Sequence, residues 1–342
     1  MRRRTLLIAI SFLGSALILW LVVRGVPLAD VWAGIQKADP LWLVASFISI
    51  FFGLVTRAVR WRGLLDDKLA MQPSIHLTNI TFMLNQLPLR LGEVARAGLA
   101  LRYGVPFMTA ATSILVERLV DVLFIVLMIA IAFTQVPSAS AQVSSGAFVL
   151  GLVALASFLA LVFFASRREL AHRFLTLGEQ MLPLLKRLPL ARLLEQVIDG
   201  LQPLTHWRGF VHTTVWTFIA WGFSYASLIT LFYALDVQDA PYLLMCMLAV
   251  GFTAIGIAIP ISVMSLGPFQ AVMLLVAHQI FGVDEALALT LGFLFNGVAV
   301  LSYLAWGGLS MLTLGLSFSD VLGSKPTPTP DAQAEPLAQP KI

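Results

Sequence analysis

The chain has 342 residues, of which 59% are hydrophobic and only 12% are charged, and its formal net charge is +4. Soluble domains contain about 25% charged residues, so this composition excludes a soluble globular protein and predicts a membrane protein. The basic excess does not indicate nucleic acid binding, because membrane proteins concentrate Lys and Arg in their cytoplasmic loops. The single cysteine, Cys246, excludes an intramolecular disulfide and a cysteine-based metal site.

The apolar segments predict the number of membrane spans. Arg2 to Arg4 precede an apolar run over residues 6–23 that is too long for a cleaved signal peptide, so we expect a retained signal anchor. Five further segments are long enough to cross a hydrocarbon core of about 30 Å. They cover residues 41–59, 108–133, 147–165, 211–235 and 285–316. The sequence therefore predicts an all-α polytopic integral membrane protein with about six full spans.

Two more apolar segments, residues 72–103 and 242–281, are interrupted. The interrupting residues are Pro88 and Gly92 in the first, and Pro260, Gly267 and Pro268 in the second. Broken hydrophobic segments in corresponding positions of two halves are typical of transporter binding sites. Non-helical backbone is tolerated at membrane depth only where protein or a water-filled cavity satisfies it. We expect two interrupted hairpins, either re-entrant or fully spanning, whose breaks approach each other as in inverted halves.

The distribution of Lys and Arg predicts the orientation. Basic residues gather at the N-terminus, in residues 57–68 and in residues 167–208, whereas the connections 134–146 and 236–242 have none. Because positive loops stay inside, we expect both termini on the cytoplasmic side of the plasma (inner) membrane. Residues 167–208 also contain leucines and prolines, and we expect an amphipathic connector there, either on the inner leaflet or solvated.

The domain organisation is simple. We expect residues 1–318 to form a single transmembrane domain. Residues 319–342 are polar and include the run Lys325-Pro326-Thr327-Pro328-Thr329-Pro330, which predicts a disordered Pro-rich tail.

Six ionisable residues lie close together at predicted membrane depth. They are Arg90, Glu93, Arg96, Glu117, Arg118 and Asp121. An isolated charge at a helix centre costs about 2.5–3.5 kcal/mol, so such groups pair or face a cavity. Helical spacing allows Glu93 to pair with Arg96, and Arg118 with Asp121. One interpretation is a neutral network that only stabilises a broken helix. The other leaves one or two arginines free to bind an anionic head group through the guanidinium fork.

We therefore expect a substrate site in the first hairpin and a supporting network beside it. The substrate-binding candidates are Asn85, Arg90, Glu93 and Arg96, and the supporting charges are Glu117, Arg118 and Asp121. The second hairpin would form the opposite, uncharged wall of the substrate site with Pro260, Ser262, Ser265, Gly267 and Gln270.

The motif N-x-L-P-x-R-x-G-E-x-A-R, from Asn85 to Arg96, followed by E-R-x-x-D from Glu117, resembles the lysylphosphatidylglycerol synthase transmembrane region, a flippase-like domain family. The stretch from Pro260 to Gln270 is similar to the family's second signature, with Gln270 in place of the usual acidic residue. The resemblance covers about residues 5–316 and implies a role in moving lipid between leaflets. Larger members add a soluble aminoacyl-transferase domain that is not seen here, so we do not expect synthase activity.

The expected function is that of a transporter or flippase-like protein that binds or translocates an anionic phospholipid or lipid-linked intermediate, without a cofactor or metal. The sequence has no P-loop, H-E-x-x-H or G-x-S-x-G motif, and its five histidines lack ligand spacing. Two alternatives stay open. One is a membrane-embedded transferase acting on a lipid phosphate, and the other is a scaffold or regulator of a partner membrane enzyme, docked through residues 167–208.

Overall fold

A computed structural model of the chain describes residues 2–88, 90–136, 141–167, 169–170, 173, 195, 198–238, 240–258 and 264–322. This described part contains twelve α-helices and no strand. The predicted all-α class is therefore confirmed.

The first half of the chain supplies seven helices. They are α1 (Arg2–Val23), α2 (Leu28–Lys37), α3 (Pro40–Leu64), α4 (Met71–Leu84), α5 (Gly92–Ala100), α6 (Phe107–Gln135) and α7 (Ala141–Ser166). The start of α3 follows from its sequence. Asp39 accepts a hydrogen bond from the Leu41 N–H at 2.8 Å, and Pro40 occupies the first turn, where its missing N–H is not needed.

The second half supplies five helices. They are α10 (Trp207–Ala234), α11 (Tyr242–Ala258), α12 (Pro268–Met273), α13 (Glu285–Thr313) and α14 (Phe318–Leu322). A π-helical segment, η4 (Leu274–Ile280), continues α12. Helix α14 covers the first residues of the predicted tail, and the rest of that tail lies outside the described residues, as does most of the predicted connector.

All six apolar segments predicted to span the membrane are helical. By length and composition, four helices of the described part qualify as spans: α3, α7 from Ser144, α10 and α13. Helices α1 and α2 meet at 91° and count together as a fifth candidate. Helix α6 has 29 residues and includes three charged residues, Glu117, Arg118 and Asp121. The number of spans therefore stays a prediction.

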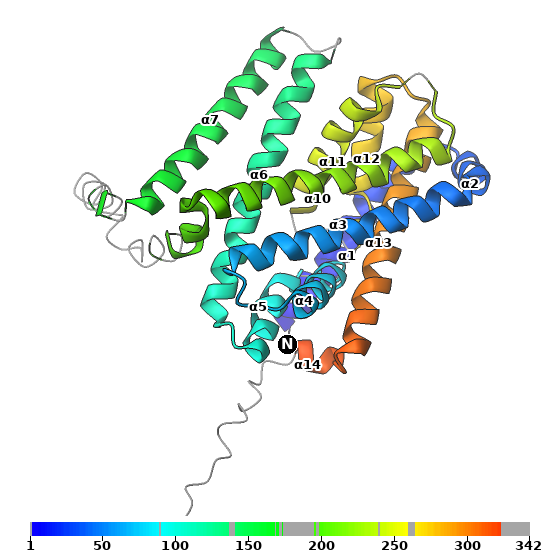
Figure 1. The fold of residues 1–342 in the computed structure, drawn as a ribbon. Helices are drawn as coiled ribbons and strands as arrows, with labels where there is room; N and C mark the ends of the chain where they lie inside the picture. Colours follow the sequence, from blue (N-terminus) through cyan, green and yellow to red (C-terminus); the bar gives the residue numbers. More distant parts are fainter. Residues whose placement is uncertain are drawn as a thin grey trace, which may run out of the picture.

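The helices form a body from which one hairpin projects (Figure 1). Helices α3 and α10 pack side by side, and α4 packs against α13. Helix α7 packs on α6, and the pair extends beyond the other helices (Figure 1). Large apolar side chains of α7, among them Phe148, Leu150 and Phe163, are more than half exposed. Such a surface suits contact with lipid tails.

The two interrupted segments are broken where the sequence predicts. Helix α4 ends at Leu84 and α5 begins at Gly92, while α11 ends at Ala258 and α12 begins at Pro268. The breaks contact each other directly, because the Met264 N–H donates a hydrogen bond to the Gln86 carbonyl oxygen at 3.1 Å. The prediction that the breaks approach each other is confirmed.

Left-handed backbone occurs in both breaks. Arg90 has a φ of 47°, Met264 of 51° and Ser265 of 56°. Residues with a side chain avoid this region, at a cost of about 1–3 kcal/mol each, unless the surrounding structure holds them there. One such restraint is visible, because Asn296 of α13 donates a hydrogen bond from Nδ2 to the Met264 carbonyl oxygen at 2.9 Å.

Gly92 allows the first break to close. Its N–H donates to Asn85 Oδ1 at 3.0 Å, and a Cβ on Gly92 would lie 2.1 Å from the Thr81 carbonyl oxygen. We predict that Gly92→Ala lowers the free energy of unfolding by about 1–3 kcal/mol, because backbone must move to admit the methyl group. Thermal unfolding in detergent would measure the change.

Gly98 provides the matched control in the same helix. A Cβ there would meet nothing within 4 Å. Gly98→Ala should leave the melting temperature unchanged or raise it, since alanine favours helix over glycine by about 1 kcal/mol. Equal melting temperatures for the two variants would contradict the tight closure at Gly92.

Candidate functional site

A cavity of about 420 Å³ lies among α3, α4, α5, α6, α10, α11, α12 and α13. Its volume falls within the range of roughly 300–1,000 Å³ that is typical of ligand pockets. Both breaks contribute to its wall, the first with Asn85 and Gln86 and the second with Ser265. The two interrupted segments therefore meet at the cavity.

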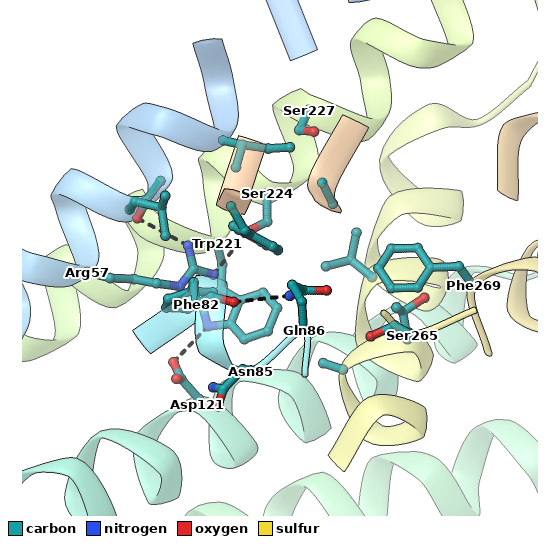
Figure 2. A pocket seen from close by; sticks show the side chains of 18 of the residues that line it. Arg57, Phe82, Asn85, Gln86, Asp121, Trp221, Ser224, Ser227, Ser265 and Phe269 are labelled. Carbon is teal, nitrogen blue, oxygen red and sulfur yellow. Dashed lines mark hydrogen bonds between the residues drawn. The ribbon is translucent and has the colours of Figure 1, made fainter. Parts of the chain in front are cut away.

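The cavity is charged on one side. Figure 2 shows Arg57 and Asp121 on one side, with Ser265 and Phe269 on the other. The charged residues of the lining are Arg57, Arg90, Glu93, Arg118 and Asp121, and its apolar residues include Ile125, Val250, Ala254, Phe295 and Val300. An amphipathic lining of this kind suits a ligand with a polar and an apolar part.

A buried ion-pair network lies behind the charged side. Arg60 of α3 donates from Nη1 to Asp121 Oδ1 at 2.7 Å and from Nη2 to Asp121 Oδ2 at 3.0 Å. Its Nη2 also donates to Glu117 Oε1 at 3.1 Å, and its Nη1 to Thr217 Oγ1 at 3.0 Å. The indole N–H of Trp221 donates to Asp121 Oδ1 at 3.1 Å. The network therefore joins α3, α6 and α10.

Two arginines of the predicted cytoplasmic stretch, Arg57 and Arg60, contribute to the cavity or to the network behind it. Arg60 belongs to the predicted cytoplasmic residues 57–68, but its side chain is fully buried. The sequence does contain a signal, because Arg57 and Arg60 are spaced i, i+3 within a largely apolar helix and thus lie on one face. Arg90, Arg96 and Arg118 already balance the three carboxylates of the predicted cluster, so charge balance alone does not call for a fourth arginine.

Arg96 and Glu93 have different partners from those expected. Arg96 is buried, lies 4.6 Å from the centre of the Trp61 ring, and pairs with Glu117 at 2.8 Å. Glu93 pairs with Arg118 at 3.0 Å, and both of these side chains are more than one third exposed. The pairs therefore connect α5 to α6 instead of forming within α5. Arg118 also lies 3.7 Å from Asp121, the spacing-based pair that was predicted.

Two arginines of the cavity have no carboxylate partner among the described residues. Arg57 donates to the Gly53 and Ala220 carbonyl oxygens at 3.2 and 3.4 Å and to Ser224 Oγ at 3.1 Å. Its guanidinium lies 5.6 Å from the Phe82 ring centre and 5.5 Å from that of Trp221. The partly buried Arg90 side chain makes no hydrogen bond or ion pair within the described part of the chain.

The charges around the cavity do not balance. The described cations are Arg57, Arg60, Arg90, Arg96 and Arg118, and the described anions are Glu93, Glu117 and Asp121. Five arginines against three carboxylates leave an excess of two positive charges. The excess lies at Arg57 and Arg90, which line the cavity.

The remaining predicted site residues divide into three groups. Asn85 and Ser265 line the cavity. Gly267 and Gln270 do not line it; the Gly267 N–H donates to Gln270 Oε1 at 2.8 Å at the start of α12. Pro260 and Ser262 lie outside the described residues. Within the described residues, no three His, Cys, Asp or Glu side chains form a group that could hold a metal ion.

Removing Arg60 tests the network. Arg60→Gln would leave the buried Asp121 with a single described ion pair, to Arg118 at 3.7 Å, and breaking a buried ion pair costs about 3–5 kcal/mol. We predict a large fall in the melting temperature, measured by thermal unfolding of the purified protein. The double variant Arg60→Gln/Asp121→Asn should recover part of the loss, since it removes both charges. A single variant as stable as the wild type would show that the network does not support the fold.

Comparison with known proteins agrees with this architecture. The sequence model of the family described as lysylphosphatidylglycerol synthase TM region matches residues 7–307. No curated protein and no solved structure matches the chain. The match extends from α1 into α13 and includes both breaks and the charged network. The chain therefore belongs to the lysylphosphatidylglycerol synthase transmembrane region family.

Proposed function

We propose that the chain binds the phosphate of an anionic lipid in its central cavity and moves that lipid across the membrane. The observation on which the proposal depends is the excess of two positive charges at Arg57 and Arg90. Family membership supports a membrane protein connected with lipid metabolism or transport.

The unpaired arginines favour an anionic ligand for an energetic reason. A buried or partly buried charge without a counter-ion is costly, and a charge-assisted pair lowers that cost. The guanidinium group presents donors in a planar fork that matches phosphate oxygens. Arg57 and Arg90 have no such acceptor among the described carboxylates, so a ligand phosphate would supply the missing counter-charge.

The lining of the cavity favours a lipid over a free phosphate compound. The charged residues are accompanied by apolar side chains from α11, α12 and α13, among them Val250, Phe269 and Phe295. A lipid would match this lining, because its head group is charged and polar while the first part of its acyl chains is apolar. Helices α3, α10 and α13, which line the cavity, are apolar and long enough to cross a bilayer. The bilayer itself would then supply such a ligand.

We propose that some of the ion-paired residues stabilise the fold and that others border the bound lipid. Arg60, Arg96 and Glu117 are fully buried within the network, and we assign them to the fold. Glu93 and Arg118 line the cavity and are partly exposed. We propose that Arg57 and Arg90 hold the phosphate and that the Glu93–Arg118 pair borders it.

Arg90 is the sharpest test of the proposal, because its side chain makes no hydrogen bond or ion pair within the described part of the chain. We predict that Arg90→Gln leaves the melting temperature close to that of the wild type. It should weaken binding of phosphatidylglycerol by about 10- to 100-fold, the loss expected for one charged hydrogen bond. Arg90→Lys should restore only part of the affinity, since a point charge lacks the fork. Lipid binding and transfer of labelled phosphatidylglycerol in liposomes would be measured together.

Two further variants control the experiment. Arg102 is exposed and does not line the cavity, so Arg102→Gln should change neither stability nor lipid binding. Arg96→Gln should lower the melting temperature, because Arg96 pairs with the buried Glu117. Normal lipid binding and transfer by a stable Arg90→Gln protein would contradict the role of Arg90.

The orientation is part of the proposal, with both termini in the cytoplasm of a cell whose plasma (inner) membrane holds the protein. In a Cys246→Ala background, a cysteine at Ser145 near the α6–α7 turn should react with a membrane-impermeant thiol reagent added from outside. A cysteine at Lys68, which is exposed after α3, should not react in intact cells. Labelling of Lys68→Cys alone would reverse the orientation.

A further inference from the structure

The part of the cavity formed by α11, the second break and α13 has polar but uncharged side chains. They include Thr253, Ser265 and Asn296, which we call the neutral wall. Figure 2 shows Ser265 on the side away from Arg57. No Asp, Glu, Lys or Arg of these elements lines the cavity, within the residues that the structure describes.

Thr253 has an unused hydroxyl group. Threonines inside helices commonly donate to the carbonyl oxygen four residues earlier, as Thr217 does to Thr213 at 2.7 Å. Thr253 is only 4% exposed, and its Oγ1 is buried without a hydrogen-bond partner in the described part of the protein. Leaving a buried hydroxyl without a partner is unfavourable, and a hydroxyl group on a ligand would supply that partner.

The other two side chains of the neutral wall, Asn296 and Ser265, also have polar atoms that can form further hydrogen bonds. Asn296 uses Nδ2 to hold the Met264 carbonyl oxygen, while its Oδ1 accepts no hydrogen bond from a described residue. Ser265 makes no side-chain hydrogen bond with a described residue. Together the three side chains offer donors and acceptors, which is what a hydroxylated group requires.

A positively charged head group would find little support in this cavity. Its two carboxylates are already engaged, Glu93 with Arg118 and Asp121 with Arg60. The excess of two positive charges would also repel a further cation. The group attached beyond the phosphate is therefore best accommodated if it is polar and neutral.

We propose that the neutral wall selects lipids whose phosphodiester bears a neutral, hydroxylated head group such as glycerol or a sugar, with Thr253 as a specificity-determining residue. This inference rests on the proposed function, because it assumes that the phosphate lies beside Arg57 and Arg90.

The test compares phosphatidylglycerol with phosphatidylpropanol, which has the same charge and the same three head-group carbons but no free hydroxyl. Binding of each lipid to the purified full chain in detergent would be measured by native mass spectrometry. The wild type should bind phosphatidylglycerol about 10-fold more tightly, as two ordinary hydrogen bonds would allow. Thr253→Val should weaken phosphatidylglycerol binding by about 3- to 10-fold and leave phosphatidylpropanol binding unchanged.

Thr78 gives the matched control. It lies in α4, is fully buried, and has an Oγ1 without a described partner, but it does not line the cavity. Thr78→Val should change the binding of neither lipid. If Thr253→Val and Thr78→Val behave alike, Thr253 has no role in specificity and the inference fails.

Other outcomes separate this inference from the proposed function. Equal binding of the two lipids by the wild type, with both weakened by Arg90→Gln, would overturn the neutral-wall inference and leave the phosphate site standing. Tighter binding of lysyl-phosphatidylglycerol than of phosphatidylglycerol would also overturn it, because the head group would then be cationic. If Arg90→Gln weakens neither lipid, the proposed function and the inference both fail.

Discussion

The buried fork between Arg60 and Asp121 is the interaction on which the rest of the structure depends. It joins α3 to α6, while Thr217 and Trp221 add contacts from α10. Removing these charges from water is unfavourable. The attraction between the two ions offsets this desolvation only when their geometry is good and further hydrogen bonds are made. The network meets this condition for Asp121, with two bonds from one guanidinium and one from an indole. Because the carboxylates of the network already have partners, Arg57 and Arg90 are the charges of the cavity that stay unbalanced.

The breaks and the network together define where the cavity lies. Helix α5 begins only after the first break, so Glu93 and Arg96 project towards α6 from a short helix. A continuous α4–α5 helix would place them elsewhere around its axis, since each residue turns the helix by about 100°. The interruption thus positions one charged residue at the cavity and another inside the network. Broken helices serve this purpose in many transporters.

The sequence predicted the long apolar helices, both breaks and six members of the charged cluster, because hydrophobic length, proline and glycine act locally. It did not predict the pairing. Glu93 and Arg96 satisfy the i, i+3 rule but pair across two helices, which depends on how α5 packs against α6. Arg60 was missed for the same reason, since an arginine near a helix end looks like a loop charge until its neighbours are known. Long-range packing, which composition does not encode, decides both cases.

The contact between the two breaks has a consequence for sequence variation. Met264 and Gln86 are joined through main-chain atoms, a nitrogen from one and a carbonyl oxygen from the other. Nearly any amino acid supplies those atoms, so natural selection can alter both side chains while the junction persists. Proline is the exception at position 264, because it lacks the donor hydrogen. Related chains can therefore exchange side chains at this junction and keep its hydrogen bond, although the left-handed backbone of Met264 disfavours β-branched residues as well as proline.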